Sequence, residues 1–323
     1  MEPLPRGANF IRSKTLWEIG LNIAGNPATP YGGNRDMCIV VGTGSGETFK
    51  PAIRMATGSP LLAHAVAAGD IEMAFVNPSG FVTQAYRGTG LFPEPLPMRV
   101  VINYPSWDRF VCAIDSRTGI TSLAQIKERK YPLRLSLREE RAHSTRYLID
   151  QMLGLYGFSI KDIESWGGKF HYAGPPGDER RIAAMQAGEI EAIFDEGIVQ
   201  NMWFDLALSL GWRAVEIDPP VMKALQDIGW RRGVMPAGTF PHLTHDYACI
   251  DYSGWPLYTR ASLPDEVAYD VCEACMAREK EIPWEEGAYT NIGQLGQDTV
   301  ATPIDVPLHP GAARWFREHG YQG

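Results

Sequence analysis

Two stretches of this sequence repeat one another and limit the folds that the chain can adopt. Ala65–Phe75 reads AVAAGDIEMAF and Ala184–Phe194 reads AMQAGEIEAIF, at an offset of 119. They agree at six positions and keep an acid at a seventh. Each predicts a helix end capped by glycine, an acidic turn and a buried strand. Two such units predict two α/β lobes, unless one favourable turn was reused by chance.

The repeats also predict where a ligand would bind. In α/β sheets, ligands bind beyond the carboxyl ends of the strands. Asn77, Pro78 and Ser79 follow the first repeat, and Asp195–Gly197 follow the second. We expect these two groups to leave equivalent strand ends and to face each other across a cleft.

Two extended stretches predict how the lobes are joined. Residues 98–115 and 246–259 are rich in β-branched and aromatic residues, which favour strands. The second repeat lies between them and the first lies outside, so the chain crosses twice. We therefore expect a two-lobe α/β fold with a twice-crossed hinge. The expected boundaries are an N-terminal extension with a helix at 1–36, lobe 1 at 37–105 plus 250–323, lobe 2 at 112–245, and crossings at about 104–112 and 246–256.

Composition limits the partners. The 323 residues carry a net charge of −8, so neither a nucleic-acid backbone nor an anionic membrane surface is a plausible bulk partner. No apolar run approaches the roughly 18 residues of a membrane span. The start at Met1 lacks the pattern of a secretory signal. The chain is then either cytoplasmic, if native as given, or periplasmic with its signal removed.

A glycine-rich loop follows the expected strand Met37–Gly42. Its residues Thr43–Thr48 read TGSGET and precede a helical pattern. Backbone N–H groups in such a loop can meet an anion or a polar ligand, although a tight turn that binds nothing is an equal alternative. Neither the dinucleotide fingerprint nor the P-loop is present. Cys272 and Cys275 lie in a helical run, so we expect structural thiols, and we expect no metal and no cofactor.

Seven motifs stand in a familiar order: TGSG, AAGDIEMAFVNPS, Ser116–Ile126, AGEIEAIF, Pro236–Pro241, Leu263–Tyr269 and PLHPGAARW. In this order the chain resembles the TAXI-type solute-binding proteins of TRAP transporters, over about 37–320. The resemblance implies the type II periplasmic-binding-protein fold, a Venus-flytrap body that captures a small, usually carboxylate-bearing solute. It also implies delivery to the membrane subunits of a TRAP transporter.

The resemblance and the strand ends together give the expected ligand-binding residues. By position, the family's ligand loops map to Thr43–Thr48, Gly58 and Ser59, Asn77–Ser79, the start of the helix after Leu137, and Asp195–Gly197. The expected ligand-binding set is Thr43, Gly44, Ser45, Gly46, Glu47, Thr48, Ser59, Asn77, Ser79, Trp107, Arg141, His143, Ser144, Asp195 and Glu196.

One loop departs from the family and supports a rival hypothesis. Where the family has a small Gly/Ser-rich turn, this chain has SLREERAHST at 136–145, which brings ionisable side chains to the cleft. A cytoplasmic enzyme on the same fold, a decarboxylase or hydrolase of a small carboxylic acid, would use His143, Glu196 and Glu47 as its catalytic groups. A ligand sensor with a protein partner is a third alternative.

The cations near the two loop entries predict the ligand's charge. A buried carboxylate needs a paired cation or backbone N–H groups. The expected cations are Lys50, Arg54, Arg138, Arg141 and Arg146. Phe49, Trp107 and Trp255 would suit an aromatic acid.

Overall fold

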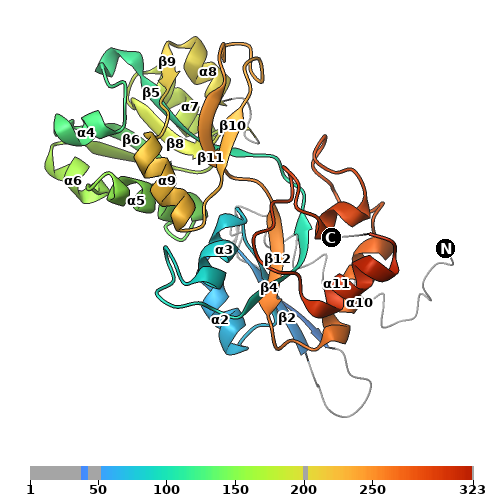
Figure 1. The fold of residues 1–323 in the computed structure, drawn as a ribbon. Helices are drawn as coiled ribbons and strands as arrows, with labels where there is room; N and C mark the ends of the chain where they lie inside the picture. Colours follow the sequence, from blue (N-terminus) through green and yellow to red (C-terminus); the bar gives the residue numbers. More distant parts are fainter. Residues whose placement is uncertain (1–37, 43–51, 199–202, 322–323) are drawn as a thin grey trace.

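The computed structural model describes residues 38–42, 52–198 and 203–321 (Figure 1). The predicted N-terminal extension at 1–36 and the loop Thr43–Thr48 lie outside the described residues. No helix in the described part of the chain combines the length and the apolar character that a bilayer crossing requires.

Lobe 1, as the term is used below, is the first sheet with its helices. The sheet has the strand order β1-β2-β3-β12-β4. Its strands are β1 (Cys38–Gly42), β2 (Ala52–Thr57), β3 (Met73–Phe75), β4 (Met98–Tyr104) and β12 (Trp255–Arg260). Its helices are α2 (Leu62–Ala68), α3 (Gly80–Arg87), α10 (Asp265–Ala277) and α11 (Pro310–Glu318), with a 3-10 turn at Ile292–Gly296.

Lobe 2 is the second sheet with its helices. The order is β10-β11-β5-β8-β6-β7, and β9 also pairs with β5. The strands are β5 (Arg109–Asp115), β6 (Arg134–Arg138), β7 (Lys169–Ala173), β8 (Ala192–Glu196), β9 (Trp212–Ala214), β10 (Arg232–Met235) and β11 (Tyr247–Asp251). The helices are α4 (Ala124–Glu128), α5 (Ser144–Leu155), α6 (Ile160–Ser165), α7 (Glu179–Gln186), α8 (Trp203–Ser209) and α9 (Pro219–Asp227), with a 3-10 turn at Ser116–Thr118.

The two repeats adopt the same local structure. Phe75 lies on β3, between parallel β2 and antiparallel β12, and Phe194 lies on β8, between parallel β6 and antiparallel β5. The glycine that ends each repeat helix has positive φ, 82° at Gly69 and 67° at Gly188, which L side chains rarely adopt. The sequence signal therefore marks two copies of one α/β turn.

An arginine clamp holds each copy of this turn. Arg54 donates to both carboxylate oxygens of Glu72 and, through Nη2, to the carbonyl of Gly69 at 3.0 Å. Arg134 donates through Nε and Nη2 to Oε2 of Glu191, through its backbone N–H to Oε1, and through Nη1 to the carbonyl of Gly188 at 2.6 Å. Glu72 and Glu191 occupy equivalent positions of the two repeats. Each glutamate therefore anchors the parallel strand that carries its arginine, β2 or β6.

The chain passes between the sheets after β4 and returns after β11, as the fold class predicts (Figure 1). The two passages are hydrogen-bonded to each other: Arg109 Nη1 donates to Asp251 at 2.7 Å and to Ser253 Oγ at 2.8 Å. The backbone N–H of Gly254 donates to the carbonyl of Ser106 at 3.0 Å. β11 pairs within lobe 2 and β12 within lobe 1. Which residues move together as a lobe stays a prediction.

Candidate functional site

A pocket lies between the two lobes and contains about 400 Å³ of space, its open mouth included. Lobe 1 and lobe 2 each supply one wall. The lining residues are Thr57, Gly58, Asn77 and Trp255 from lobe 1, and Glu140, His143, Ser144 and Glu196 from lobe 2.

The sheet topology explains why these residues meet. Thr57 ends β2, Asn77 follows β3, and Glu196 ends β8. His143 and Ser144 open α5, which follows β6. β2 is parallel to β3 and β6 is parallel to β8, so the carboxyl ends of each pair point the same way. The pocket therefore lies where α/β sheets usually bind ligands.

His143 is the N-cap of α5. Its Nδ1 accepts the backbone N–H of Thr145 at 3.2 Å and lies 2.9 Å from the Thr145 hydroxyl. An Nδ1 that accepts a backbone N–H carries no proton, so this hydrogen bond favours the tautomer with the proton on Nε2. His309 caps α11 in the same way, through Gly311 N–H, but lies outside the pocket. His143 therefore has a structural role that is independent of any ligand.

Ser144 and Asn77 tie the two walls to the second crossing. The Ser144 hydroxyl lies 2.6 Å from the Tyr252 hydroxyl. Asn77 Nδ2 donates to the carbonyls of Tyr252 and Gly254, both at 3.1 Å. Both walls thus share one anchor in the segment that joins the lobes.

A buried ion cluster supports the lobe 2 wall. Arg138 Nε donates to both oxygens of Asp195, and its Nη2 donates to Asp195 at 2.8 Å and to Glu196 at 2.7 Å. Arg181 Nη1 donates to Asp195 at 2.9 Å. Burial opposes ionisation of Asp195, yet Arg138 and Arg181 hold its pKa below the ordinary value. Asp195 is therefore a buried counter-ion, and Glu196 is the member of the pair that reaches the pocket.

The arginines expected to face a ligand carboxylate have other partners. Arg138 and Arg54 already form ion pairs with carboxylates of the protein itself, and their side chains are 4% and 40% exposed. Arg146 donates to the carbonyl of Arg138 and stacks on Tyr172. Arg141 is exposed and does not line the pocket. Among the described lining residues, a carboxylate in the pocket would then depend on backbone N–H groups and neutral donors. Lys50 lies outside the described residues.

Besides Arg141 and Asp195, three expected ligand residues lie away from the pocket lining. Ser59 accepts the backbone N–H of Leu61 before α2. Ser79 donates to the carbonyl of Ser253 and is buried. Trp107 lies at the first crossing under Arg109. Of the expected set, the pocket brings together Asn77, His143, Ser144 and Glu196, and it leaves Ser59, Ser79, Trp107, Arg141 and Asp195 outside its lining.

Sequence analysis missed Thr57, Glu140, Tyr252 and Asp108. Thr57 and Glu140 line the pocket, and their positions at the ends of β2 and β6 were the available signal. Asp108 is buried at the first crossing, where it accepts the backbone N–H groups of Arg109 and Ile198. Burial, and then the nearby Glu196, raise the pKa of Asp108 well above its ordinary value.

Asp178 is the N-cap of α7, the helix that carries Arg181. Its carboxyl group gives a prediction for stability against pH. Hydrogen bonds from Arg180 lower the pKa of Asp178 from 3.8 to about 2. A lowered carboxyl pKa contributes stability above the unfolded-state pKa, and that stability is lost as the pH falls through the folded-state pKa. We expect Asp178→Asn to reduce the free energy of unfolding above pH 3.8, and the difference from wild type to vanish toward pH 2. Asparagine also caps helices, so a difference that stays constant in urea titrations across this range would contradict the charge effect.

Comparison with known proteins gives a family and several loose structural matches. The model of the NMT1-like family matches residues 37–320. The alkanesulfonate-binding protein SsuA from Xanthomonas axonopodis pv. citri is 15% identical, with 80% of this chain and 70% of that chain covered and a TM-score of 0.32. The arginine-, lysine-, histidine-binding protein ArtJ from Geobacillus stearothermophilus is 12% identical, with 74% and 80% covered and a TM-score of 0.33. At these TM-scores, the function of neither protein can be assigned to this chain.

Proposed function

Since this chain belongs to the NMT1-like family, we propose that it is a solute-binding protein that captures a small organic acid between its two lobes. One observation carries the proposal: a single pocket takes four lining residues from each lobe. A solute held there would bridge the lobes. Its binding would then favour their approach, because a ligand shifts a conformational equilibrium toward the state that it binds better.

The lining of the pocket suits a small polar ligand. Trp255 supplies an apolar surface, Asn77, Ser144 and His143 supply polar groups, and Glu140 and Glu196 supply carboxylates. This mixture of one aromatic wall and a few polar groups is typical of sites that orient a small solute.

The start of α5 is the best place for a ligand carboxylate. The helix has 12 residues, and its N-terminus carries partial positive charge that favours an anion. The Ser144 hydroxyl and the Nε2–H of His143 can add hydrogen bonds there. Arg138 offsets the negative charge of Glu196, which reduces the repulsion that Glu196 exerts on an incoming carboxylate.

The motif order supports a TAXI-type role within this class of function. In that role the protein would act in the periplasm and deliver its solute to the membrane subunits of a TRAP transporter. The catalytic alternative has less support, since the structure uses His143 Nδ1 as a helix cap and Glu196 as an ion-pair partner. A helix cap at His143 and an ion pair at Glu196 both suit a rigid binding wall.

The function is tested by calorimetric titration with a panel of mono- and dicarboxylates, followed by mass analysis of the tightest ligand over several hours. We expect binding of at least one acid and an unchanged ligand mass. Exclusive binding of cationic or neutral compounds would contradict the proposal that the ligand carries a carboxylate. A product that forms in wild type and disappears in Glu196→Gln would replace the binding function with catalysis.

His143→Asn separates ligand binding from helix capping. Asparagine is a good N-cap, so the stability of α5 should be kept while the Nε2–H is lost. We expect affinity for the best acid to fall by about 1–3 kcal/mol, roughly 5- to 150-fold, with little change in thermal stability. His309→Asn makes the same change at a cap outside the pocket and should leave affinity unchanged. Equal effects of the two variants would argue against a ligand contact by His143.

A further inference from the structure

The lobes also touch away from the pocket, through the segment 228–231 that follows α9. Thr89 of lobe 1 donates its hydroxyl to the carbonyl of Ile228 at 2.6 Å. Trp230 and Arg231 continue the contact on two different surfaces of lobe 1. Residues 228–231 do not line the pocket described above. The contact is therefore separate from direct ligand recognition.

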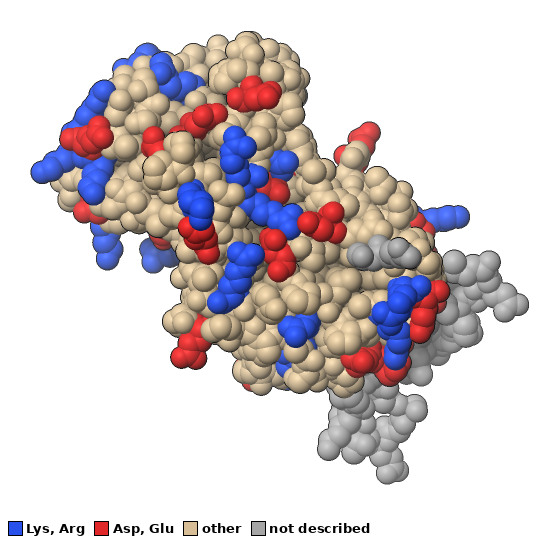
Figure 2. Space-filling view, viewed as in Figure 1, with Lys and Arg blue, Asp and Glu red and all other residues tan. Residues whose placement is uncertain are grey.

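Arg231 forms the ionic half of this contact. Its guanidinium donates to Asp305 at 2.7 and 2.9 Å and to Asp298 at 2.8 and 3.2 Å. Both aspartates lie in the segment between the Ile292–Gly296 turn and α11 of lobe 1. In Figure 2, basic and acidic side chains lie together where the lobes meet on the visible face. One lobe 2 cation thus bridges two lobe 1 carboxylates.

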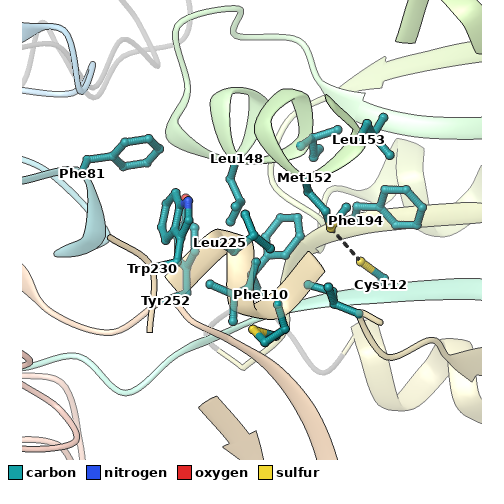
Figure 3. Close-up of a cluster of buried hydrophobic side chains, with 14 of the residues drawn as sticks. Phe81, Phe110, Cys112, Leu148, Met152, Leu153, Phe194, Leu225, Trp230 and Tyr252 are labelled. Carbon is teal, nitrogen blue, oxygen red and sulfur yellow. Dashed lines mark hydrogen bonds between the residues drawn. The ribbon is translucent and has the colours of Figure 1, made fainter. Parts of the chain in front are cut away.

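Trp230 forms the apolar half. Its ring meets that of Phe81 edge to face, with centroids 4.8 Å apart, and both side chains are at most 2% exposed (Figure 3). Trp230 Nε1 donates to Gln151 Oε1 at 2.8 Å. Gln151 of α5 in turn pairs its amide with that of Gln84 on α3. The contact between the lobes is therefore buried at the aromatic pair and hydrogen-bonded across the two glutamines.

This contact acts on both pocket walls through α3 and α5. Trp230 packs against Gly80, where an added Cβ would lie 2.7 Å from the indole ring. Gly80 is the first residue of α3, directly after Asn77, Pro78 and Ser79. Gln151 lies two turns along α5 from Ser144 of the opposite wall. The contact is therefore connected to both pocket walls, to Asn77 through Gly80 and to Ser144 through α5.

We propose that residues 228–231 form an interlobe clasp, which holds the two pocket walls at binding distance and sets the fraction of protein that can bind. The effect on affinity rests on the solute-binding function proposed above. When only part of a population is competent to bind, the apparent dissociation constant rises by the inverse of that fraction. The clasp therefore tunes affinity without touching the solute.

Single-molecule energy transfer tests the clasp. Dyes are attached through unnatural amino acids at the exposed positions 210 of lobe 2 and 266 of lobe 1. The test variant is Arg231→Gln, which removes both interlobe ion pairs and leaves the buried Trp230 in place. The matched control is Arg180→Gln, because Arg180 pairs with Glu139 and Asp178 inside lobe 2. Thr89→Val removes a second clasp bond without an ionic change.

We expect Arg231→Gln to broaden the interlobe distance distribution, Thr89→Val to do so less, and Arg180→Gln to match wild type. Affinity for the best acid should fall about three- to tenfold in Arg231→Gln, by the same factor as the competent fraction. An unchanged distribution in Arg231→Gln would overturn the clasp, as would weaker binding without any change in distribution. If wild type binds no solute, the proposed function fails, and the distance distributions alone decide the clasp.

Discussion

Asp195→Asn is expected to lower the free energy of unfolding by about 3–5 kcal/mol, because it leaves buried Arg181 without an ion-pair partner among the described residues and Arg138 with Glu196 alone. The side chains of Arg138 and Arg181 are 4% and 0% exposed. Arg181 Nε and Nη2 already lack hydrogen-bond partners among the described residues. Asparagine has the same shape as aspartate, so the loss reports charge rather than packing. Urea unfolding of both proteins measures it.

The control for Asp195→Asn is Glu139→Gln, which breaks the ion pair of Glu139 with Arg180 at side chains more than half exposed. Exposed pairs are worth about 0–1 kcal/mol, so this variant should be nearly neutral. Adding Arg181→Met to Asp195→Asn removes one unpaired cation and should recover part of the loss. A loss below about 1 kcal/mol in Asp195→Asn would contradict a buried, mutually dependent cluster.

Gly311→Ala should destabilise the protein by about 3 kcal/mol, since an added methyl group cannot be accommodated. A Cβ at Gly311 would lie 1.9 Å from the carbonyl oxygen of Asp265, at the start of α10. That oxygen belongs to backbone and cannot rotate away, so α10 and α11 would have to separate. Calorimetric melting temperatures should fall accordingly.

Gly154→Ala is the matched control for Gly311→Ala. Gly154 lies inside α5, and apart from its neighbours and the helix backbone no atom of the described residues lies within 4 Å of an added Cβ. Alanine favours the helix by roughly 0.5–1 kcal/mol over glycine, so this variant should be slightly more stable than wild type. Equal destabilisation by both variants would show that the Gly311 effect is not steric.

The repeat predicted two helix ends and two strands because their signals are local. Gly69 and Gly188 need positive φ, and the residues that follow are consecutive in sequence. The arginine clamps were not predictable from the repeat offset. Arg54 lies 18 residues before its glutamate, whereas Arg134 lies 57 residues before its own. The additional elements α5, α6 and β7 of lobe 2 lie between the second pair.

The motif PLHPGAARW is explained by packing. His309 caps α11, Pro310 occupies its first turn, Gly311 permits the close approach to α10, and Trp315 is fully buried. These residues therefore fix α11 against the rest of lobe 1. The motif identifies the fold and carries no ligand contact in the described pocket.

The candidate site was predictable only in part, for two physical reasons. Asp195 and Glu196 both accept from Arg138 Nη2, but Asp195 is also paired with buried Arg181, and only Glu196 lines the pocket. Contacts across the hinge depend on distant segments: Ser144 meets Tyr252 from 108 residues away. Sequence patterns predict where strands end, but they do not show which charged side chains on neighbouring strands will form ion pairs.

If one solute is held by both lobes, a crystal structure of the protein grown with the acid that binds most tightly in the calorimetric panel should show it. We expect the acid in the interlobe pocket, in contact with Asn77 or Gly58 on one wall and with Ser144 or His143 on the other. An acid bound outside this pocket, or in contact with one lobe alone, would contradict it.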